Sequence, residues 1–218
     1  AASDVYKRQV IILSRLFLWS PVKVDGHSMD PTLANGEYLL VLKHQSIDRF
    51  DIVVATETDD NGTTKEIVKR VIGMPGDTIQ YENDTLYING KKIDEPYLTD
   101  YIKKFKEDKL QSTYTGDDYD DNGEFFRKLA AQAQAFTVDK DGSPVFTIKL
   151  LDDEYLLLGD DRIVSKDSRQ VGAFKAKQEI TTQTDTSSAT TRGWVKQDGA
   201  WYYFDGNGNP VKNAWQGS

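Results

Sequence analysis

Hydrophobic residues along most of this chain occur in short runs separated by turn pairs, a pattern typical of β-strands. The turn pairs are Asn35-Gly36, Asn61-Gly62, Asn89-Gly90 and Asp141-Gly142, and they favour hairpins because Asn, Asp and Gly accept the backbone angles of tight turns. No long helix pattern separates the runs between Pro21 and about Lys177, so we expect a mainly β fold, an antiparallel barrel or sandwich. The expected strands include 38–42, 51–56, 66–73, 85–90 and 154–159.

Two segments instead have the pattern of helices. In residues 99–110, Ile102 and Phe105 fall at helical spacing behind a Thr-Asp start, and residues 124–135 are rich in good helix formers. Both segments lie within residues 91–150, which we therefore expect to form a small α/β insertion on the β body.

The N-terminal part of the chain changes character twice. Residues 1–9 are polar and match nothing that follows, so we expect a non-native leader. The apolar run 10–19 is too short to cross a hydrocarbon layer, which takes about 20 residues. It is either a buried terminal strand or helix, or the outer end of a membrane anchor. We expect 10–22 to be a truncated anchor end and 23–180 to be the main domain.

The C-terminal part is a linker followed by a separate module. Residues 181–192 contain eight Thr or Ser in twelve positions and no large apolar side chain, which is typical of a solvated linker. Three of the four Trp residues follow it. We expect residues 193–218 to be an independent aromatic module.

Composition excludes several classes of function. The chain of 218 residues carries 27 Lys and Arg against 35 Asp and Glu, a net charge of −8, which argues against a nucleic-acid partner. The absence of Cys excludes disulfides, thiolate nucleophiles and Cys-based zinc sites. With only two His, a metal centre is unexpected, and nothing in the sequence implies a cofactor.

A first candidate for chemistry is the segment 26–33, with the sequence GHSMDPTL. Gly26 and Pro31 restrict the backbone around Ser28 and could hold a nucleophile in a fixed pose, although an ordinary turn has the same composition. His27 cannot easily act as the base for Ser28 because adjacent side chains diverge. These residues therefore give no reason to expect a Ser-His-Asp triad.

A second candidate is Lys69, within the segment 66–77 (EIVKRVIGMPGD). In a strand, Lys69 shares a face with the apolar residues Ile67 and Val71. Its ammonium could reach water from an edge strand. Alternatively the amine is desolvated, which lowers its pKa and makes it a competent general base.

The third candidate is the segment 158–172 (LGDDRIVSKDSRQVG), in which acids, serines and arginines follow an apolar strand. A salt-bridged surface turn would have this composition. Gly159-Asp160, Ser165 and the run 167–169 at the end of a buried strand could instead brace a neighbouring site.

Taken together, these three segments resemble the bacterial type I signal peptidases. The resemblance rests on GHSMDPTL, RFDIVV (49–54), KRVIGMPGD (69–77) and GDDRIVSKDSR (159–169), in the family's order and spacing over about 150 residues. The segment DEPYLTDYIKKFKEDKLQSTY is most similar to streptococcal members. The resemblance implies a β-barrel body of the signal peptidase and LexA-like type.

The resemblance also implies a Ser/Lys dyad with Ser28 as nucleophile and Lys69 as general base. Ser165 matches the serine that orients the lysine amine. Asp160, Asp167 and Arg169 match positions that support the site. The backbone N–H of Ser28 would hold the oxyanion.

Family members cleave exported preproteins after small-x-small signals, because shallow pockets accept only small side chains. We expect Val24, Met29 and Val68 to line these pockets and the substrate to bind as an added strand. The position two residues before the nucleophile, where some members carry a hydroxyl, is Gly26. That oxyanion donor is therefore absent or replaced.

Two departures from the family pattern have structural consequences. Asp161 stands where the family usually has Asn. This difference replaces an amide by a charged group, and we expect activity to tolerate it. After the segment 171–174 the chain lacks the family's next strand and runs into the linker. We expect the closing strand of the barrel to be missing, which would leave an unpaired edge.

Residues 193–215 resemble a choline-binding, or cell-wall-binding, repeat in Gly193-Trp194-Val195, Trp201-Tyr202-Tyr203 and a Gly-Asn turn. Such repeats form hairpins that hold choline by cation–π attraction, although a hairpin without a ligand would have the same pattern. With only one full repeat present, choline binding is expected to be weak or absent.

The resemblance therefore implies a membrane-bound signal peptidase with its catalytic domain on the extracellular face of a Gram-positive cytoplasmic membrane. Its expected partners are signal-peptide preproteins, membrane lipid through the anchor, and choline on cell-wall polymers. One alternative is a LexA-type self-cleaving Ser/Lys protease, and the other is a surface choline-binding module with an inert peptidase body.

Overall fold

Seven strands of the described chain pair in one large antiparallel sheet. The computed structural model describes residue 9, residues 19–42, 46–58, 61–116, 119 and 122–175, and the backbone of 180–183, 193–197 and 200–204. Within these residues seven strands pair in the order β1-β2-β11-β3-β4-β9-β10. They are β1 (Trp19–Lys23), β2 (Tyr38–Leu42), β3 (Ile52–Thr58), β4 (Thr64–Gly73), β9 (Glu154–Leu158), β10 (Phe174–Lys175) and β11 (Ile180–Gln183).

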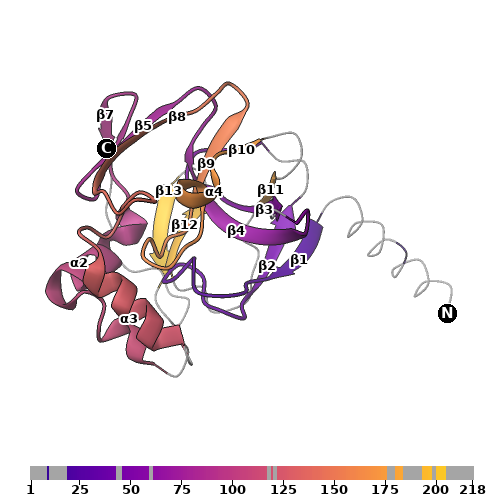
Figure 1. Cartoon of the computed structure of the whole chain (residues 1–218). Coiled ribbons are helices and arrows are strands. Elements are labelled where there is room, and N and C mark those ends of the chain that lie inside the picture. Colours follow the sequence, from indigo (N-terminus) through magenta and orange to yellow (C-terminus); the bar gives the residue numbers. More distant parts are fainter. Residues whose placement is uncertain are drawn as a thin grey trace.

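Strand β4 is an interior strand, paired with β3 on one side and β9 on the other (Figure 1). Its second half, residues 69–73, is buried without alternation. A strand buried on both faces reads as a near-continuous apolar run, and the sequence VKRVIG follows that rule except at Lys69 and Arg70. These two charged side chains therefore lie inside the protein.

A second antiparallel sheet of four strands has the order β7-β6-β5-β8 in the described chain. Its strands are β5 (Thr78–Glu82), β6 (Thr85–Ile88), β7 (Lys91–Ile93) and β8 (Val145–Lys149). The expected Asn89-Gly90 turn joins β6 to β7, and both residues have positive φ, 52° and 78°, as a tight hairpin turn requires. Two of these strands, β5 and β6, precede residue 91, and the other two, β7 and β8, lie within the expected insertion 91–150. The insertion therefore completes a sheet that begins at Thr78.

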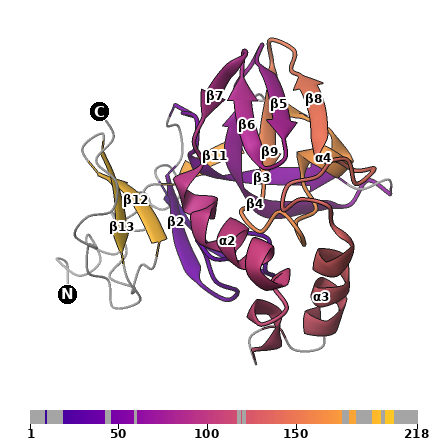
Figure 2. The same cartoon turned by 90° about the vertical axis from the view of Figure 1, so that its left-hand side faces the viewer.

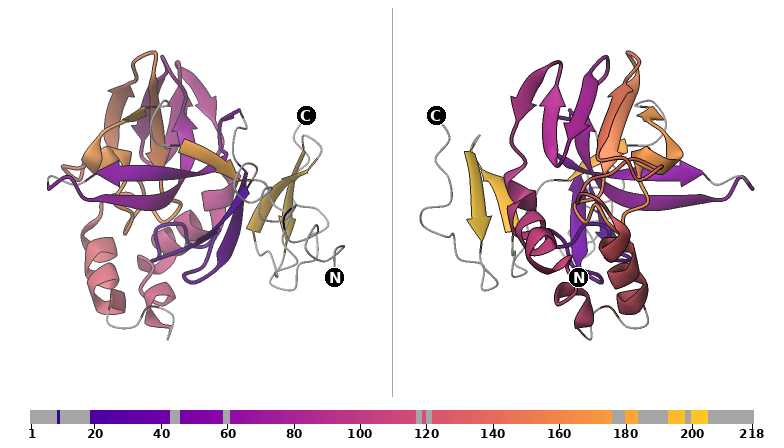
Figure 3. Two further views of the ribbon diagram at one scale, coloured as in Figure 1. Left: turned by 90° about the vertical axis from the view of Figure 1, so that its right-hand side faces the viewer. Right: turned by 60° about the vertical axis from the view of Figure 1, so that its left-hand side comes forward.

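The helices expected at 99–110 and 124–135 are present as α2 (Thr99–Asp108) and α3 (Asn122–Gln132). Short 3-10 turns η1 (Pro96–Leu98) and η2 (Thr113–Thr115) flank α2. In Figure 2 the four-stranded sheet stands on one side of β3 and β4, and the two helices lie on the other; Figure 3 shows the same layering. One buried cluster joins both parts, with Tyr81 of the small sheet, Phe105 of α2 and Leu158 of β9 among its members.

Two expected boundaries are corrected by the strand pairing. Residues 19–22, expected in the anchor end 10–22, belong to β1, which pairs with β2 from Trp19↔Leu42 onward. Residues 10–18 lie outside the described residues. Among the described residues, no helix has both the length and the apolar character needed to cross a bilayer.

The second correction concerns the linker 181–192 and the missing closing strand. Residues 180–183 form β11, which pairs with β2 and with β3. The pairing covers strand edges that would otherwise be open, and β-branched Thr is a good strand former. The remaining linker residues, 184–192, lie outside the described residues.

The C-terminal module contains the expected hairpin. Strands β12 (Gly193–Gln197) and β13 (Ala200–Phe204) pair antiparallel, with Trp194 opposite Tyr203. Together with the two antiparallel sheets, this hairpin confirms the mainly β class.

Candidate active site

The loop that connects β1 to β2 carries Ser28 in a backbone held by its own hydrogen bonds. Met29 O accepts from the N–H groups of Thr32 and Leu33 at 2.9 and 3.0 Å, and His27 O accepts from the Asp30 N–H at 3.2 Å. Gly26 precedes the turn with φ +86°, a conformation that favours glycine. Ser28 is therefore presented by a fixed turn.

Lys69 meets Ser28 directly. Its Nζ donates to Ser28 Oγ at 2.7 Å, although 41 residues separate the two in sequence. Because β4 is an interior strand, the Lys69 side chain is only 4% exposed, and this excludes the solvated-edge interpretation. Burial lowers the pKa of Lys69 to about 8, although the carboxylates of Asp167 and Glu57 act in the opposite direction.

The turn after β9 packs against this pair through Gly159. A side chain at 159 would collide with Ser165 and with the backbone carbonyl of Ser28, so only glycine allows the two segments to approach this closely. The N–H of Asp161 donates to that same Ser28 carbonyl at 3.1 Å. The turn after β9 and the loop between β1 and β2, called here the nucleophile loop after the expected role of Ser28, therefore form one unit.

Ser165 lies in this unit with its hydroxyl buried. Ser165 Oγ has no hydrogen-bond partner in the described part of the chain. Its expected hydrogen bond to the Lys69 amine therefore stays a prediction. Its position against Gly159 does place it beside the Ser28 carbonyl.

The three expected supporting residues form buried ion pairs. Asp160 accepts from Arg70 Nε and Nη2 at 2.8 and 2.6 Å, and also from the hydroxyl of Thr32 in the nucleophile loop. Arg70 lies on β4 next to Lys69 and packs over the ring of Tyr97, 4.0 Å from its centroid. This pair fixes the turn after β9 to β4.

Asp167 and Arg169 form the second pair, with Nε–Oδ1 and Nη2–Oδ2 distances of 2.9 Å each. Asp167 also accepts from the Gly159 N–H at 3.0 Å and caps the short helix α4 (Ser168–Val171). Burial alone would raise the pKa of Asp167, but Arg169 and the Gly159 N–H lower it overall. Asp167 therefore remains a carboxylate, and its charge faces the Lys69 amine.

The expected pocket residues gather next to Ser28. Val24 and Met29 are buried in a small cluster with Leu33 and Leu39, and Val68 packs against it half-buried. Val68 neighbours Lys69 on β4. Their contact with a substrate stays a prediction.

Sequence reasoning missed Arg70, Arg162 and Glu95 as parts of this region. Arg162 is fully buried and pairs with Glu95 at 2.6 Å across 67 residues of sequence. A buried ion pair leaves no local pattern, because the partner that makes the charge tolerable lies far along the chain. The usable signal was the break in the apolar run of β4 at Lys69-Arg70.

Comparison with known proteins shows one family over most of the chain. Residues 6–186 match the family model "Signal peptidase, peptidase S26", and residues 193–209 match "Putative cell wall binding repeat". Signal peptidase I of Streptococcus pneumoniae serotype 4 is 66% identical over 77% of this chain and 81% of its own. Signal peptidase I S of Bacillus subtilis is 40% identical over 77% and 76%.

A crystal structure of a signal peptidase I from Enterococcus faecalis is 26% identical, with a TM-score of 0.42, and the similarity covers 64% of this chain and 98% of that one. The family match spans most of the chain, and relatives of 66% and 40% identity share the same description. The chain therefore belongs to the signal peptidase family, peptidase S26.

Proposed function

We propose that Ser28 and Lys69 form the catalytic dyad with which this signal peptidase, a serine endopeptidase, removes signal peptides from exported preproteins. The observation that carries the proposal is the 2.7 Å contact between Lys69 Nζ and Ser28 Oγ, made by an amine whose burial lowers its pKa to about 8. A neutral amine at this distance is within reach of the hydroxyl proton.

The chemistry follows from these two groups. Lys69 takes the proton of the Ser28 hydroxyl as its oxygen attacks the scissile carbonyl, and a tetrahedral oxyanion forms. When the C–N bond breaks, Lys69 returns the proton to the leaving amine and an acyl-Ser28 remains. A water molecule, deprotonated in turn by Lys69, then releases the signal peptide and restores Ser28. Asp167 and Glu57 stabilise the transient ammonium, since both raise the pKa of Lys69.

The backbone N–H of Ser28 is the proposed donor to the oxyanion. Among the described residues it has no hydrogen-bond acceptor of its own, and the bond from Asp30 N–H to His27 O fixes the peptide plane that contains it. Gly26 supplies no hydroxyl, so this site depends strongly on one donor. Losing an oxyanion donor costs about 10²–10³ in kcat.

The expected supporting residues Ser165, Asp160, Asp167 and Arg169 are proposed to hold the dyad rather than to react. Asp160 acts through Arg70, and Asp167 acts through Arg169 and the Gly159 N–H. Ser165 is proposed to donate to or accept from the Lys69 amine during the reaction. The support for this role is its buried hydroxyl beside Gly159.

We propose small-x-small specificity with pockets formed around Val24, Met29 and Val68. The support is their clustering against the nucleophile loop. The finer placement of the enzyme, with an anchor in the cytoplasmic membrane and its catalytic domain outside, is also proposed from the family.

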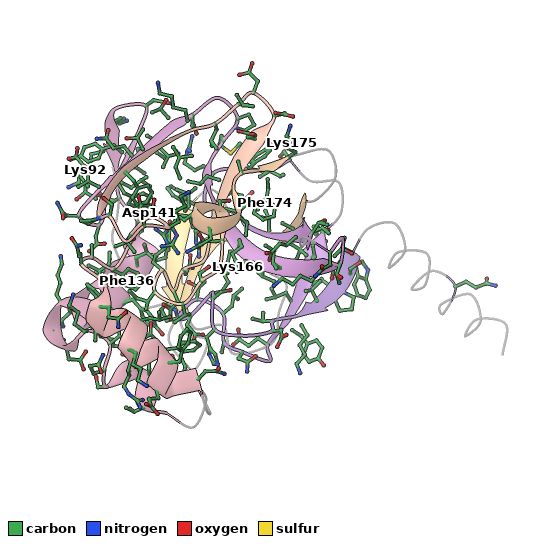
Figure 4. All side chains as sticks on the ribbon, viewed as in Figure 1. Lys92, Phe136, Asp141, Lys166, Phe174 and Lys175 are labelled. Atoms are coloured by element: carbon green, nitrogen blue, oxygen red, sulfur yellow. The ribbon has the colours of Figure 1, made fainter. Side chains whose placement is uncertain are left out.

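The test is the cleavage of an Ala-x-Ala preprotein peptide by Ser28→Ala and Lys69→Ala variants. Each is expected to lose turnover completely while the circular dichroism spectrum stays that of the wild type. Lys92→Ala is the matched control, because Lys92 is exposed on β7 (Figure 4), which belongs to the four-stranded sheet and not to the sheet that carries Lys69. Retained turnover in either dyad variant would refute the proposal.

A second function is proposed for the C-terminal hairpin. Its match to a cell-wall-binding repeat and its paired strands β12 and β13 support binding of choline on cell-wall polymers. Retention on a choline matrix tests this, and retention without peptidase activity would favour the alternative of an inert peptidase body. The family match over residues 6–186 favours a signal peptidase over a LexA-type self-cleaving protease.

A further inference from the structure

A second group of buried ionisable side chains lies beside the nucleophile and takes no part in the proposed chemistry. Asp161 is completely buried and Asp30 is 7% exposed. Aromatic groups from the insertion surround them. The group consists of His27 and Asp30 of the nucleophile loop, Tyr101 of α2, Tyr114 of η2, Tyr119, and Asp161 of the turn after β9.

Asp161 is held by hydrogen-bond donors that carry no charge. The hydroxyl of Tyr114 lies 2.9 and 3.0 Å from its two carboxyl oxygens, and the Ile163 N–H donates at 3.2 Å. Within the described residues no cation forms an ion pair with Asp161. The two nearby arginines have other partners: Arg70 pairs with Asp160, and Arg162 pairs with Glu95.

Ionising two acids that face each other in a buried site has a high free-energy cost, because their charges repel and both are removed from water. Asp30 bonds to His27 Nδ1 at 3.0 Å, so Asp30 has a partner that favours its charge, whereas Asp161 faces Asp30 and tyrosines. Burial first, and the nearby Asp30 second, raise the pKa of Asp161 to about 8, against the opposing effect of Tyr114. A carboxyl in this setting carries its proton at neutral pH.

Residues of this group also form hydrogen bonds to the peptide groups on both sides of Ser28. The Asp161 N–H donates to Ser28 O, and the Asp30 N–H donates to His27 O. His27 in turn packs against the ring of Tyr119, with centroids 4.6 Å apart. Moving Asp161 would therefore move the Ser28 carbonyl.

We propose that Asp161 is a positioning residue whose uncharged carboxyl, held by Tyr114, keeps the Ser28 loop in its reactive conformation, and that loss of this proton lowers turnover. The inference rests on the proposed role of Ser28. Ionisation would place a second negative charge against Asp30 and push the turn away from the loop. The effect is expected on kcat, because Asp161 acts through the Ser28 carbonyl, whereas substrate selection is proposed for Val24, Met29 and Val68.

The groups that face Asp161 determine which other ionisations could contribute to the pH dependence of turnover. From the nucleophile loop they are Asp30 and, behind it, His27. From the insertion they are Tyr101, Tyr114 and Tyr119, and burial raises the pKa of all three tyrosines above the ordinary value of 10.0. These tyrosines stay neutral, so Asp161 and Lys69 are the groups we expect to titrate near pH 8.

The experiment compares wild type, Asp161→Asn and Asp161→Ala in the turnover of an Ala-x-Ala preprotein peptide across pH. Asn keeps the shape and the acceptor without the ionisation, so it is expected to keep turnover at pH 7. At about pH 9.5, where a group of pKa near 8 is mostly ionised, its kcat should exceed that of the wild type by about fivefold or more. Ala, which offers Tyr114 no acceptor, is expected to lower kcat by about tenfold at every pH with KM unchanged.

Asp141→Asn, an exposed acid in a turn, is the matched control and should reproduce the wild-type profile. Thermal melts give a second measurement. Because folded Asp161 holds its proton to higher pH than the unfolded residue, with its ordinary pKa of 3.8, wild-type stability falls relative to Asp161→Asn between about pH 4 and pH 8.

If Ser28→Ala is inactive but wild type and Asp161→Asn have identical pH profiles and identical thermal melts, the inference is overturned and the proposed dyad is not. An inactive Asp161→Asn that is still folded would also overturn it, since the charge would then be required. If Ser28→Ala retains turnover, the dyad itself fails, and the inference fails with it.

Discussion

At the scale of single residues, the burial of Lys69 costs the folded protein stability. The amine has an ordinary pKa of 10.5 and a folded pKa of about 8. Each unit of difference corresponds to about 1.4 kcal/mol. At neutral pH the folded state therefore holds a proton on an amine whose charged form its surroundings disfavour, and this cost in stability accompanies the proposed role of Lys69 as the base.

Lys69→Met is accordingly expected to be inactive and more stable than the wild type, by about 1–3 kcal/mol at pH 7. The unfolded lysine binds its proton up to pH 10.5 whereas the folded one releases it near 8. The difference in free energy of unfolding between Lys69→Met and the wild type should therefore be largest below pH 8 and should disappear between pH 8 and 10.5. Urea unfolding at several pH values measures it. A variant less stable than the wild type at pH 7 would contradict this account of the lysine.

Residues 28 and 69 were both evident in the sequence, but their environments were not. Strand alternation placed Lys69 among apolar neighbours without deciding between an edge and an interior strand. The decision depends on β9, more than 80 residues later in the chain, pairing with β4. For the same reason the burial of Arg70 was not predictable, since Asp160 supplies its partner.

At the scale of elements, the site depends on one close approach between the nucleophile loop and the turn after β9. Gly159 lies where any Cβ would meet Ser165 and the Ser28 carbonyl. Three hydrogen bonds then fix the turn: Asp161 N–H to Ser28, Gly159 N–H to Asp167, and Ser165 N–H to Asp161. The turn acts as a rigid support behind Ser28.

Gly159→Ala is expected to reduce kcat by about 10²-fold, because a displacement of Ser28 by about 1 Å is enough to do so. Gly142→Ala is the control: its φ of +82° also makes Ala unfavourable, but open space surrounds it. The control should lose about 1 kcal/mol of stability and keep its kcat. Steady-state kinetics with denaturation curves separate the two effects, and unchanged turnover in Gly159→Ala would show that the approach is not needed.

The elements themselves were largely predictable, because hairpin turns and helical spacing are local signals. Asn89-Gly90 formed the expected tight turn, and both insertion helices were found within a few residues of their expected bounds. Strand β11 was not expected, since a Thr-rich segment without large apolar side chains also describes a linker. Its pairing depends on the open edges of β2 and β3, which no local pattern reveals.

At the scale of the whole molecule, long-range contacts join the insertion to the catalytic sheet. Arg162 bonds to Glu95 before η1 and to Tyr81 of the small sheet, and Tyr114 bonds to Asp161. Strand β11 joins β2, which follows the nucleophile loop, to β3, which flanks the strand of Lys69. The sheet that carries Lys69 therefore includes the first residues after 179.

A chain ending at Thr186 is accordingly expected to keep its melting temperature and its peptidase activity, and to lose any retention on a choline matrix. A chain ending at Glu179 lacks β11 and exposes the edges of β2 and β3, so its melting temperature and activity should both fall. Thermal melts and peptide cleavage on both truncations provide the comparison. Equal behaviour of the two chains would show that β11 contributes nothing.

The central claim is that the amine at position 69 loses its proton near pH 8, far below the ordinary lysine value of 10.5, while it touches the hydroxyl of Ser28. Titration of ¹⁵N-lysine-labelled protein by NMR, with Lys69→Met to assign the resonance, measures this directly. The account expects an apparent pKa of about 8 for Lys69, well below the ordinary lysine value of 10.5. A Lys69 resonance that titrates near 10.5 would contradict it.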